Sequence, residues 1–191
     1  MAVVAGGVDH FPMEIDQRSP ARLLPAGIWA VDGRRSTVGF SIRHLMVSNV
    51  RGRFTEFEGT FWCDDSGAFG GTGSVAAASI DTGEAVRDRR LREPEFFDVG
   101  RSPQIRFSCS WIKPADAGAF KVTGELEIKG ARDEIELRVE PLATVVDEAR
   151  LKARGELDRK AFGIVSDALL EAGVSDRVKL RLDLSLLRVR D

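Results

Sequence analysis

The sequence predicts an all-β protein of antiparallel strands, and three observations support that fold class. Apolar and polar residues alternate over five segments, which is typical of strands with one face in the core and one in water. Parallel strands are usually buried on both faces and lack this alternation, so antiparallel strands are expected. Turn-forming residues separate the segments, and only one stretch has clear helical character.

The alternating segments are the expected strands. Residues 50–63 are long for one strand, and their apolar phase changes between Phe54 and Phe57, which predicts a bulge or bend at residues 55–56. Residues 143–157 alternate more weakly and are interpreted as another strand. The five clearest segments are residues 37–43, 105–111, 120–129, 134–140 and 178–186.

Turns are expected where Gly, Asp and Ser gather between the strands. Gly33 separates the first two strands. Residues 65–67 and 70–71 together mark one further turn, and residues 116–118 and 129–131 mark two more.

Residues 82–93 do not alternate and are rich in helix formers, so we expect a short helix there, ended by Pro94. Asp81 and Glu84 have the spacing of a capping box. A second short helix or an irregular turn is expected within residues 159–170. Many strands with one or two short helices favour an up-and-down or meander barrel, or a sandwich.

Length and composition set the domain organisation and exclude several function classes. The 191 residues suit one domain, expected at 27–191, after a flexible N-terminal arm at 1–26. A net charge of -2 argues against nucleic-acid binding. No apolar run approaches the ~18 residues of a membrane span, so stable membrane insertion is not expected.

The first 26 residues lack the basic start and the unbroken apolar core of a secretory signal, so a cytoplasmic location is expected. Cys63 and Cys109 would then be reduced thiols that act as small apolar side chains. The two cysteines and two histidines match no zinc-ligand spacing, and neither a metal nor another cofactor is expected.

The inward faces of the strands carry Phe, Leu, Ile and Val and few charges. A barrel of about eight strands has room inside for side chains or for one small elongated ligand. The pattern alone therefore leaves two interiors open, an apolar container and a core filled by its own side chains.

The sequence resembles the YceI-like family, the lipocalin-like polyisoprenoid-binding domains, over residues 27–189. The order and spacing of the matching segments carry the resemblance, because no single segment is diagnostic. The segments are WAVDGRRSTVGFSIRHL (29–45), VRGRFTEFEGT (50–60), SIDTG (79–83), RDRRLREPEFFDV (87–99), PQIRFSCS (103–110), VTGELEIKG (122–130) and AFGI (161–164).

The resemblance implies an extended, lipocalin-like antiparallel barrel of eight strands with a hydrophobic tunnel. It implies a polyisoprenoid or another long lipid-like chain as the ligand, and often a homodimer. Many family members are exported to the periplasm, a location that we do not expect for this chain. Arg90 stands where the family's R-D-x-H-L pattern places His, so a role of that His is not transferred here.

Two sets of candidate binding residues follow. His44 ends a strand and could contact a polar ligand head, act as a general base, or be structural. Arg159 is a second candidate for head-group contact. The expected tunnel-lining side chains are all apolar: Phe40, Ile42, Phe54, Phe57, Leu91, Phe96, Phe97, Ile105, Phe107, Leu126, Ile128 and Phe162.

The expected helix adds a charged rim at one barrel mouth. Asp88 lies among the arginines of this helix, whose guanidinium groups suit a pyrophosphate or carboxylate head, although a solvated helix face would look the same. These arginines are Arg87, Arg89, Arg90 and Arg92.

The leading interpretation is a non-enzymatic protein that binds, sequesters or carries a long apolar molecule such as a polyprenyl chain, a quinone or a fatty-acid derivative. One alternative is an enzyme acting on a lipid-like substrate, with His44 and Asp88 as acid and base. The other alternative is a stress-related interaction scaffold with a filled core.

Overall fold

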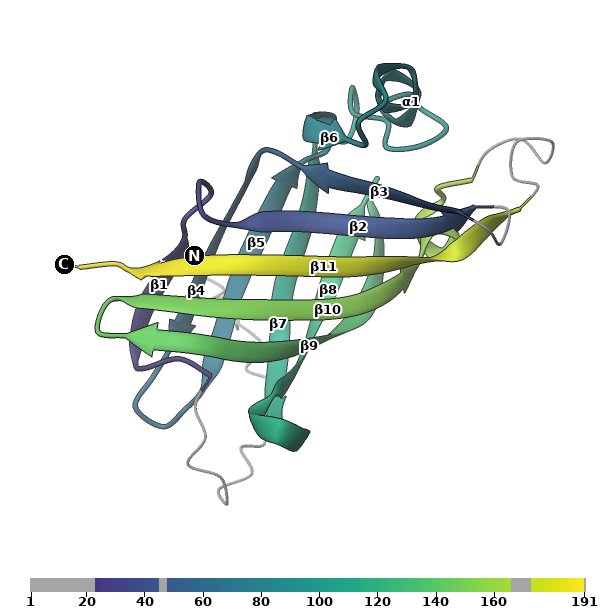
Figure 1. Cartoon of the computed structure of the whole chain (residues 1–191). Helices are drawn as coiled ribbons and strands as arrows, with labels where there is room; N and C mark the ends of the chain where they lie inside the picture. The colour runs from purple at the N-terminus through teal and green to yellow at the C-terminus, as the bar shows by residue number, and fades with distance from the viewer. Residues whose placement is uncertain (1–22, 45–47, 166–172, 191) are drawn as a thin grey trace, which may run out of the picture.

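The computed structural model describes residues 23–44, 48–165 and 173–190, and it consists mainly of strands (Figure 1). The helical elements are α1 (Ala85–Leu91) and the 3-10 turns η1 (Ala77–Ser79), η2 (Asp116–Gly118) and η3 (Arg159–Phe162). The strands are β1 (Gly27–Val31), β2 (Thr37–His44), β3 (Ser48–Phe54), β4 (Phe57–Cys63), β5 (Phe69–Ala76), β6 (Ile80–Asp81), β7 (Gln104–Pro114), β8 (Phe120–Ile128), β9 (Ala131–Val145), β10 (Glu148–Asp158) and β11 (Val174–Arg188).

Eight of these strands form a closed antiparallel barrel. The hydrogen-bonded order is β1-β4-β5-β7-β8-β9-β10-β11, and a pairing between β1 and β11 closes the ring. The long strand β11 carries two neighbours on one edge, because Leu186 to Arg188 pair with β1 while Val174 to Asp183 pair with β2. Strands β2, β3 and β6 therefore extend the barrel wall beyond the ring. The predicted antiparallel eight-stranded barrel is confirmed.

All five clearest segments are strands in the structure. The predicted break in residues 50–63 falls at residues 55–56, where the chain bends and divides the segment into β3 and β4. The division matters because β3 pairs with β2 and β6, whereas β4 pairs with β1 and β5. The predicted strand at 143–157 is wrong at its start, since β9 runs to Val145 before the turn into β10.

The turn predicted over residues 65–71 is present at residues 65–66 but ends earlier than expected, because Gly70 and Gly71 lie inside β5. Glycine at these two positions allows close packing against the aromatic side chains of β4. A Cβ atom at Gly70 would lie 2.6 Å from Cζ2 of Trp62, and one at Gly71 would lie 2.5 Å from Cδ1 of Phe61. The missing side chains let the aromatic rings of β4 lie across β5.

Helix α1 lies where the sequence predicts it, but the predicted capping box is wrong. Glu84 is the N-cap residue, and its side chain makes no capping hydrogen bond. The Asp81 carboxylate accepts a hydrogen bond from the amide of Gly83, which precedes the N-cap, at 3.0 Å. Asp88 stabilises the start of the helix instead, because its Oδ1 accepts hydrogen bonds from Thr82 N at 3.0 Å and Thr82 Oγ1 at 2.5 Å.

The barrel is packed shut at the end where the chain enters β1. Trp29 and Leu186 are 0% exposed and Leu24 is 1% exposed, and the Trp29 indole donates a hydrogen bond to the Pro25 carbonyl at 2.9 Å. The predicted flexible arm is therefore wrong for its last residues, since Leu23 and Leu24 belong to the core. Residues 1–22 of that arm lie outside the described residues.

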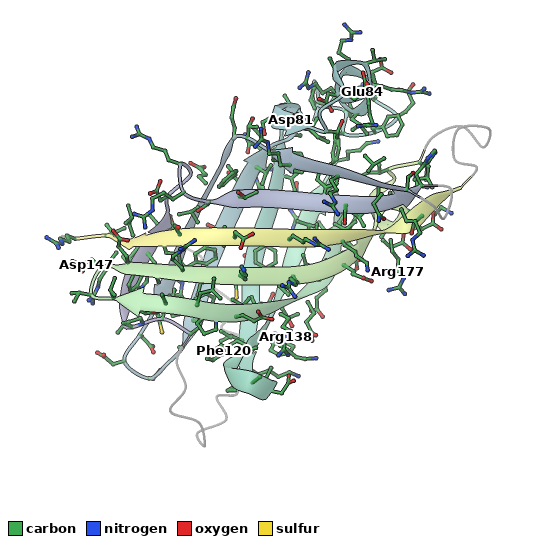
Figure 2. The ribbon with its side chains drawn as sticks, in the orientation of Figure 1. Asp81, Glu84, Phe120, Arg138, Asp147 and Arg177 are labelled. Carbon is green, nitrogen blue, oxygen red and sulfur yellow. The ribbon has the colours of Figure 1, made fainter. Side chains whose placement is uncertain are left out.

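Many polar and charged side chains lie on the outer face of the barrel (Figure 2), although some apolar ones such as Ile28 and Trp62 are exposed there too. Ion pairs join neighbouring elements there, such as Lys121 Nζ to Glu136 Oε1 at 2.8 Å and Arg138 Nη1 to Asp116 Oδ1 at 2.6 Å. The hydrogen bond from Arg138, followed by its charge, lowers the pKa of Asp116. Within the described part of the chain, no helix is long and apolar enough to cross a bilayer.

Candidate ligand-binding cavity

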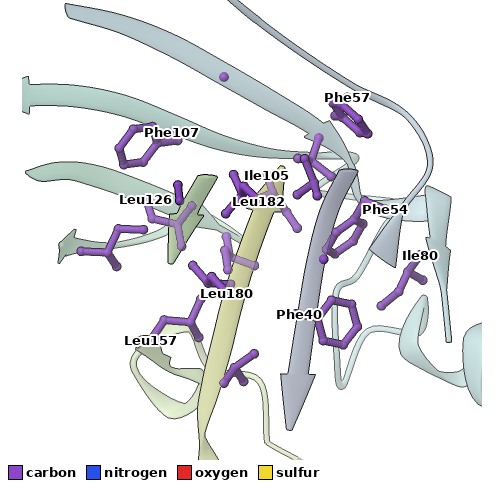
Figure 3. Close-up of a pocket in the computed structure, with 18 of the residues that line it drawn as sticks. Phe40, Phe54, Phe57, Ile80, Ile105, Phe107, Leu126, Leu157, Leu180 and Leu182 are labelled. Atoms are coloured by element: carbon purple, nitrogen blue, oxygen red, sulfur yellow. The ribbon is translucent and has the colours of Figure 1, made fainter. Parts of the chain in front are cut away.

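The barrel encloses a cavity of about 540 Å³ whose wall is formed mainly by the inward apolar side chains of the strands. Figure 3 shows side chains from several strands converging on this space, among them Phe40, Phe107, Leu126 and Leu180. The lining extends from Leu23, near the packed end, to His44 at the other end of the barrel. A volume of this size lies within the usual range for small-molecule sites.

Burial along β11 shows that the interior is hollow rather than filled. Val178, Leu180, Leu182 and Leu184 point inward and line the cavity, yet each is only partly buried. Leu186, the next inward residue, is 0% exposed. Since a close-packed core would bury all five alike, the predicted alternative of a filled core is wrong.

Aromatic rings join the cavity wall to the segment around α1. The Phe40 and Phe54 ring centroids are 5.7 Å apart, and the Phe54 and Phe97 centroids are 5.9 Å apart in an edge-to-face arrangement. Phe40 also lies over Gly52 of β3, where a Cβ atom would approach its Cζ to 2.3 Å. These contacts hold the segment that follows α1 against the end of the barrel.

Polar groups gather at this α1 end of the cavity. Thr82 and Arg87 both line the cavity. Arg87 donates from Nε to Thr82 Oγ1 at 2.8 Å and from Nη2 to the Thr82 carbonyl at 3.0 Å. Because Asp88 accepts from the same threonine, the buried carboxylate holds Thr82, and Thr82 in turn holds Arg87.

The other arginines of the predicted rim have different roles. Arg90 lines the cavity, is exposed, and has its Cζ 5.9 Å from the centroid of the Phe96 ring. Arg92 binds the barrel edge, since its guanidinium donates to the carbonyls of Ala78 at 2.8 Å and Ile80 at 3.2 Å. Arg89 is exposed and does not line the cavity.

Arg159 lines the cavity from η3 and is 5% exposed. Its guanidinium donates to the Ile164 carbonyl at 2.9 Å and the Ser175 carbonyl at 3.1 Å, and lies 3.3 Å from Asp176 Oδ1. These contacts make Arg159 a brace between η3 and the start of β11.

Lys129, in the turn between β8 and β9, joins the two segments at this end. Its Nζ donates to the Pro94 carbonyl at 2.8 Å and to the Gly163 carbonyl at 3.4 Å. The segments around α1 and η3 are therefore tied together at the α1 end of the barrel.

The structure brings most of the predicted site residues to one cavity. All twelve apolar candidates except Phe162 line it, and so do His44 and Arg159. Phe162 is 1% exposed and packs in the core, and Asp88 is buried beside Thr82, so neither lines the cavity. The main residues missed are on β9, β10 and β11, although their alternation indicated inward faces: Ile135, Leu137, Val139, Leu151, Leu157, Val178, Leu180, Leu182 and Leu184.

The cysteines do not form a reactive or metal-binding cluster. Cys63 is buried, and burial raises the pKa of the Cys109 thiol to about 11. Across residues 23–44, 48–165 and 173–190, no group of three or more His, Cys, Asp or Glu side chains could hold a metal ion.

The fold and the cavity define a class of protein, a closed antiparallel β-barrel around an apolar hollow with a charged end. Comparison with known families is consistent with this class, because residues 29–186 match the model of the YceI-like domain. The chain belongs to the YceI-like family.

Individual relatives agree with this assignment. Protein YceI of Salmonella newport is 30% identical over 143 residues, which cover 71% of this chain and 74% of the relative. The crystal structure of BcnA from Burkholderia cenocepacia has a TM-score of 0.74 at 25% identity and covers 81% of this chain and 98% of BcnA. A polyisoprenoid-binding domain from Saccharophagus degradans shares the fold at 14% identity, with a TM-score of 0.68 over 84% of this chain and 98% of that domain.

Proposed function

We propose that this protein binds and carries a long apolar molecule, such as a polyisoprenoid, a quinone or a fatty-acid derivative, inside its barrel. The observation that carries the proposal is the hollow of about 540 Å³ with a mainly apolar lining. A soluble protein gains nothing in stability by leaving Leu180 and Leu182 partly unpacked, since such voids forfeit dispersion contacts. A guest that fills the void would restore them.

The energetics of burial favour a long guest. Each buried CH₂ group contributes ~0.8 kcal/mol, so an isoprene unit offers about 3–4 kcal/mol before the costs of ordering are subtracted. A few units suffice for micromolar binding without any polar contact. The Saccharophagus degradans domain of the same fold is described as polyisoprenoid-binding, which supports a ligand of this class.

Native mass spectrometry of the full chain tests the proposal. The protein is purified after exposure to an extract of cellular membranes. The bound lipid is then extracted, and its molecular mass is measured. We expect a discrete additional mass that is lost on extraction. A protein that stays empty and takes up no hydrophobic fluorophore would refute the carrier function.

A cavity-filling variant makes the same test specific. Leu182→Trp adds bulk to the middle of the cavity and should weaken binding about tenfold or more by occupying the guest's space. Arg181→Trp is the matched control, because Arg181 is the exposed neighbour on the same strand. Equal affinities of the two variants would argue against binding inside the barrel.

We infer binding without chemistry rather than catalysis. The enzyme alternative needs His44 and Asp88 to face one space, but Asp88 is not among the residues that line the cavity with His44. The Asp88 carboxylate is instead occupied by its two hydrogen bonds from Thr82. The homodimer stays a prediction, which analytical ultracentrifugation of the full chain would test.

A further inference from the structure

We propose that the cavity prefers apolar chains that end in an anionic group, a carboxylate or a phosphate, and that Arg90 and Arg87 bind this group. The inference deepens the proposed function and rests on it. It starts from the charges on the cavity wall, which are those of Glu58, Arg87, Arg90 and Arg159, with His44 as a further titratable side chain.

Two of these charges already have partners. Arg159 pairs with Asp176 and binds two backbone carbonyls. Glu58 lies on β4 and accepts a hydrogen bond from Ser74 Oγ on β5 at 3.1 Å. Neither group needs a ligand to complete its hydrogen bonding.

Arg87 and Arg90 differ, because neither forms an ion pair with any carboxylate of the described residues. The carboxylate between them in sequence, that of Asp88, is buried and bound to Thr82. Arg87 is held in place by Thr82, and the contact of Arg90 is the face of the Phe96 ring. Two cations thus border an apolar space without a direct ion pair to a carboxylate of the described residues, and the Asp88 carboxylate reaches Arg87 only through the Thr82 hydroxyl.

Guanidinium groups in such a place favour an anion over a neutral group of the same size. Their planar donors match the oxygens of a carboxylate or a phosphate, and these charge-assisted bonds are about twice as strong as neutral ones. Arg87 is partly buried, so the apolar wall beside it lowers the local dielectric and strengthens its attraction for an anion, whereas Arg90 is exposed to solvent. An anionic head would therefore lie at α1, with its apolar chain extending past Phe40 and Phe54 into the barrel.

The test compares ligands with one chain and different heads. Dodecanoate, dodecyl phosphate, dodecan-1-ol and dodecyltrimethylammonium are titrated into the full-length protein at pH 8, by displacement of a fluorescent fatty-acid analogue. We expect both anions to bind about tenfold more tightly than the alcohol. The preference should shrink when NaCl is raised from 50 to 500 mM, because salt screens the attraction at an exposed mouth.

Substitutions on one helix then assign the preference to a residue. Arg90→Gln should reduce the anion-to-alcohol affinity ratio severalfold, because it removes the charge that favours the anions. Arg89→Gln is the matched control, since Arg89 lies on the same helix but away from the cavity, and it should keep the full ratio. Arg90→Lys should keep part of the preference through its charge.

The outcomes separate this inference from the proposed function. Equal affinity for anions and alcohol, or an unchanged ratio in both Arg90→Gln and Arg87→Gln, would overturn the head-group assignment while leaving the carrier intact. Failure to bind any of the four amphiphiles would overturn the carrier function itself. Inorganic phosphate alone should not displace the fluorophore at millimolar concentration; if it competes as well as dodecyl phosphate, the site binds free anions and the lipid assignment is wrong.

Discussion

Phe107 and its neighbour Ser108 lie on opposite faces of the barrel wall. Its ring lines the cavity and lies over Gly124 of β8, where a Cβ atom would approach its Cζ to 2.4 Å. Its neighbour Ser108 is exposed on the outer face. A one-residue shift of register would exchange their environments, so the pair reports directly on the strand phase.

Phe107→Asp should destabilise the domain by about 2–4 kcal/mol, because it removes an aromatic contact and places a charge against an apolar wall. Ser108→Asp should stay within about 0.5 kcal/mol of the parent. Chemical denaturation of both variants measures the two free energies of unfolding. Similar values for the two would contradict the assigned register.

At the same scale, the sequence predicted the environment of a side chain where strand alternation determines it, and failed where hydrogen bonds or turns outside the strands determine it. Alternation alone indicated the inward side of Phe40 and Leu126, and both line the cavity. It could not place Asp88, because the hydrogen bonds that bury this carboxylate come from Thr82, six residues earlier. Phe162 was predicted to line the tunnel, but η3 places it in the packed core.

Helix α1 is the element that brings charge to the cavity, and Asp88 fixes its start. Asp88→Ala would leave two hydrogen-bond donors of Thr82 without their acceptor and should cost about 1–3 kcal/mol. Glu84→Ala should cost under about 0.5 kcal/mol, because this N-cap side chain makes no capping bond. Hydrogen exchange of the amides in α1 distinguishes local from global loosening.

The reverse order, with Glu84→Ala the more damaging change, would restore the capping box that the sequence suggested. Spacing alone could not decide between Asp81 and Asp88 as the acceptor, since both lie within a turn of the helix start. The strands were easier to predict, with the exception of β5. Its adjacent glycines resemble a turn in sequence, whereas in the structure they make room for Phe61 and Trp62.

At the scale of the whole molecule, closure of the sheet was beyond the reach of the strand pattern. A sandwich and a barrel have the same alternation, and the difference rests on three paired residues of β1, Trp29 to Val31, which join β11. The family resemblance supplied the barrel, because it carries information about strand order that periodicity lacks. The hollow likewise depends on side-chain volumes summed over many strands.

The length of the hollow makes a prediction about chain length. Residues from Val174 to Leu184 of β11 line it, a span of roughly 30 Å at the usual rise of an extended strand. In a series of straight-chain fatty acids, each added CH₂ should tighten binding by up to about fourfold until the hollow is full, after which affinity should level off.

Calorimetric titration of the series locates the plateau, and Leu182→Trp should move it to shorter chains. An affinity that does not change with the number of carbons would show that the chain binds elsewhere.

Leu24, Trp29 and Leu186 are buried at one end of the barrel, so a guest of the proposed kind would enter and leave at the opposite, α1 end. Such a guest would enter with its apolar tail first and leave with its polar end first. An acceptor, whether an enzyme or a membrane, would then bind the polar end before the apolar chain leaves the barrel. Uptake and release would both use this one end, and neither would require strands of the barrel to separate.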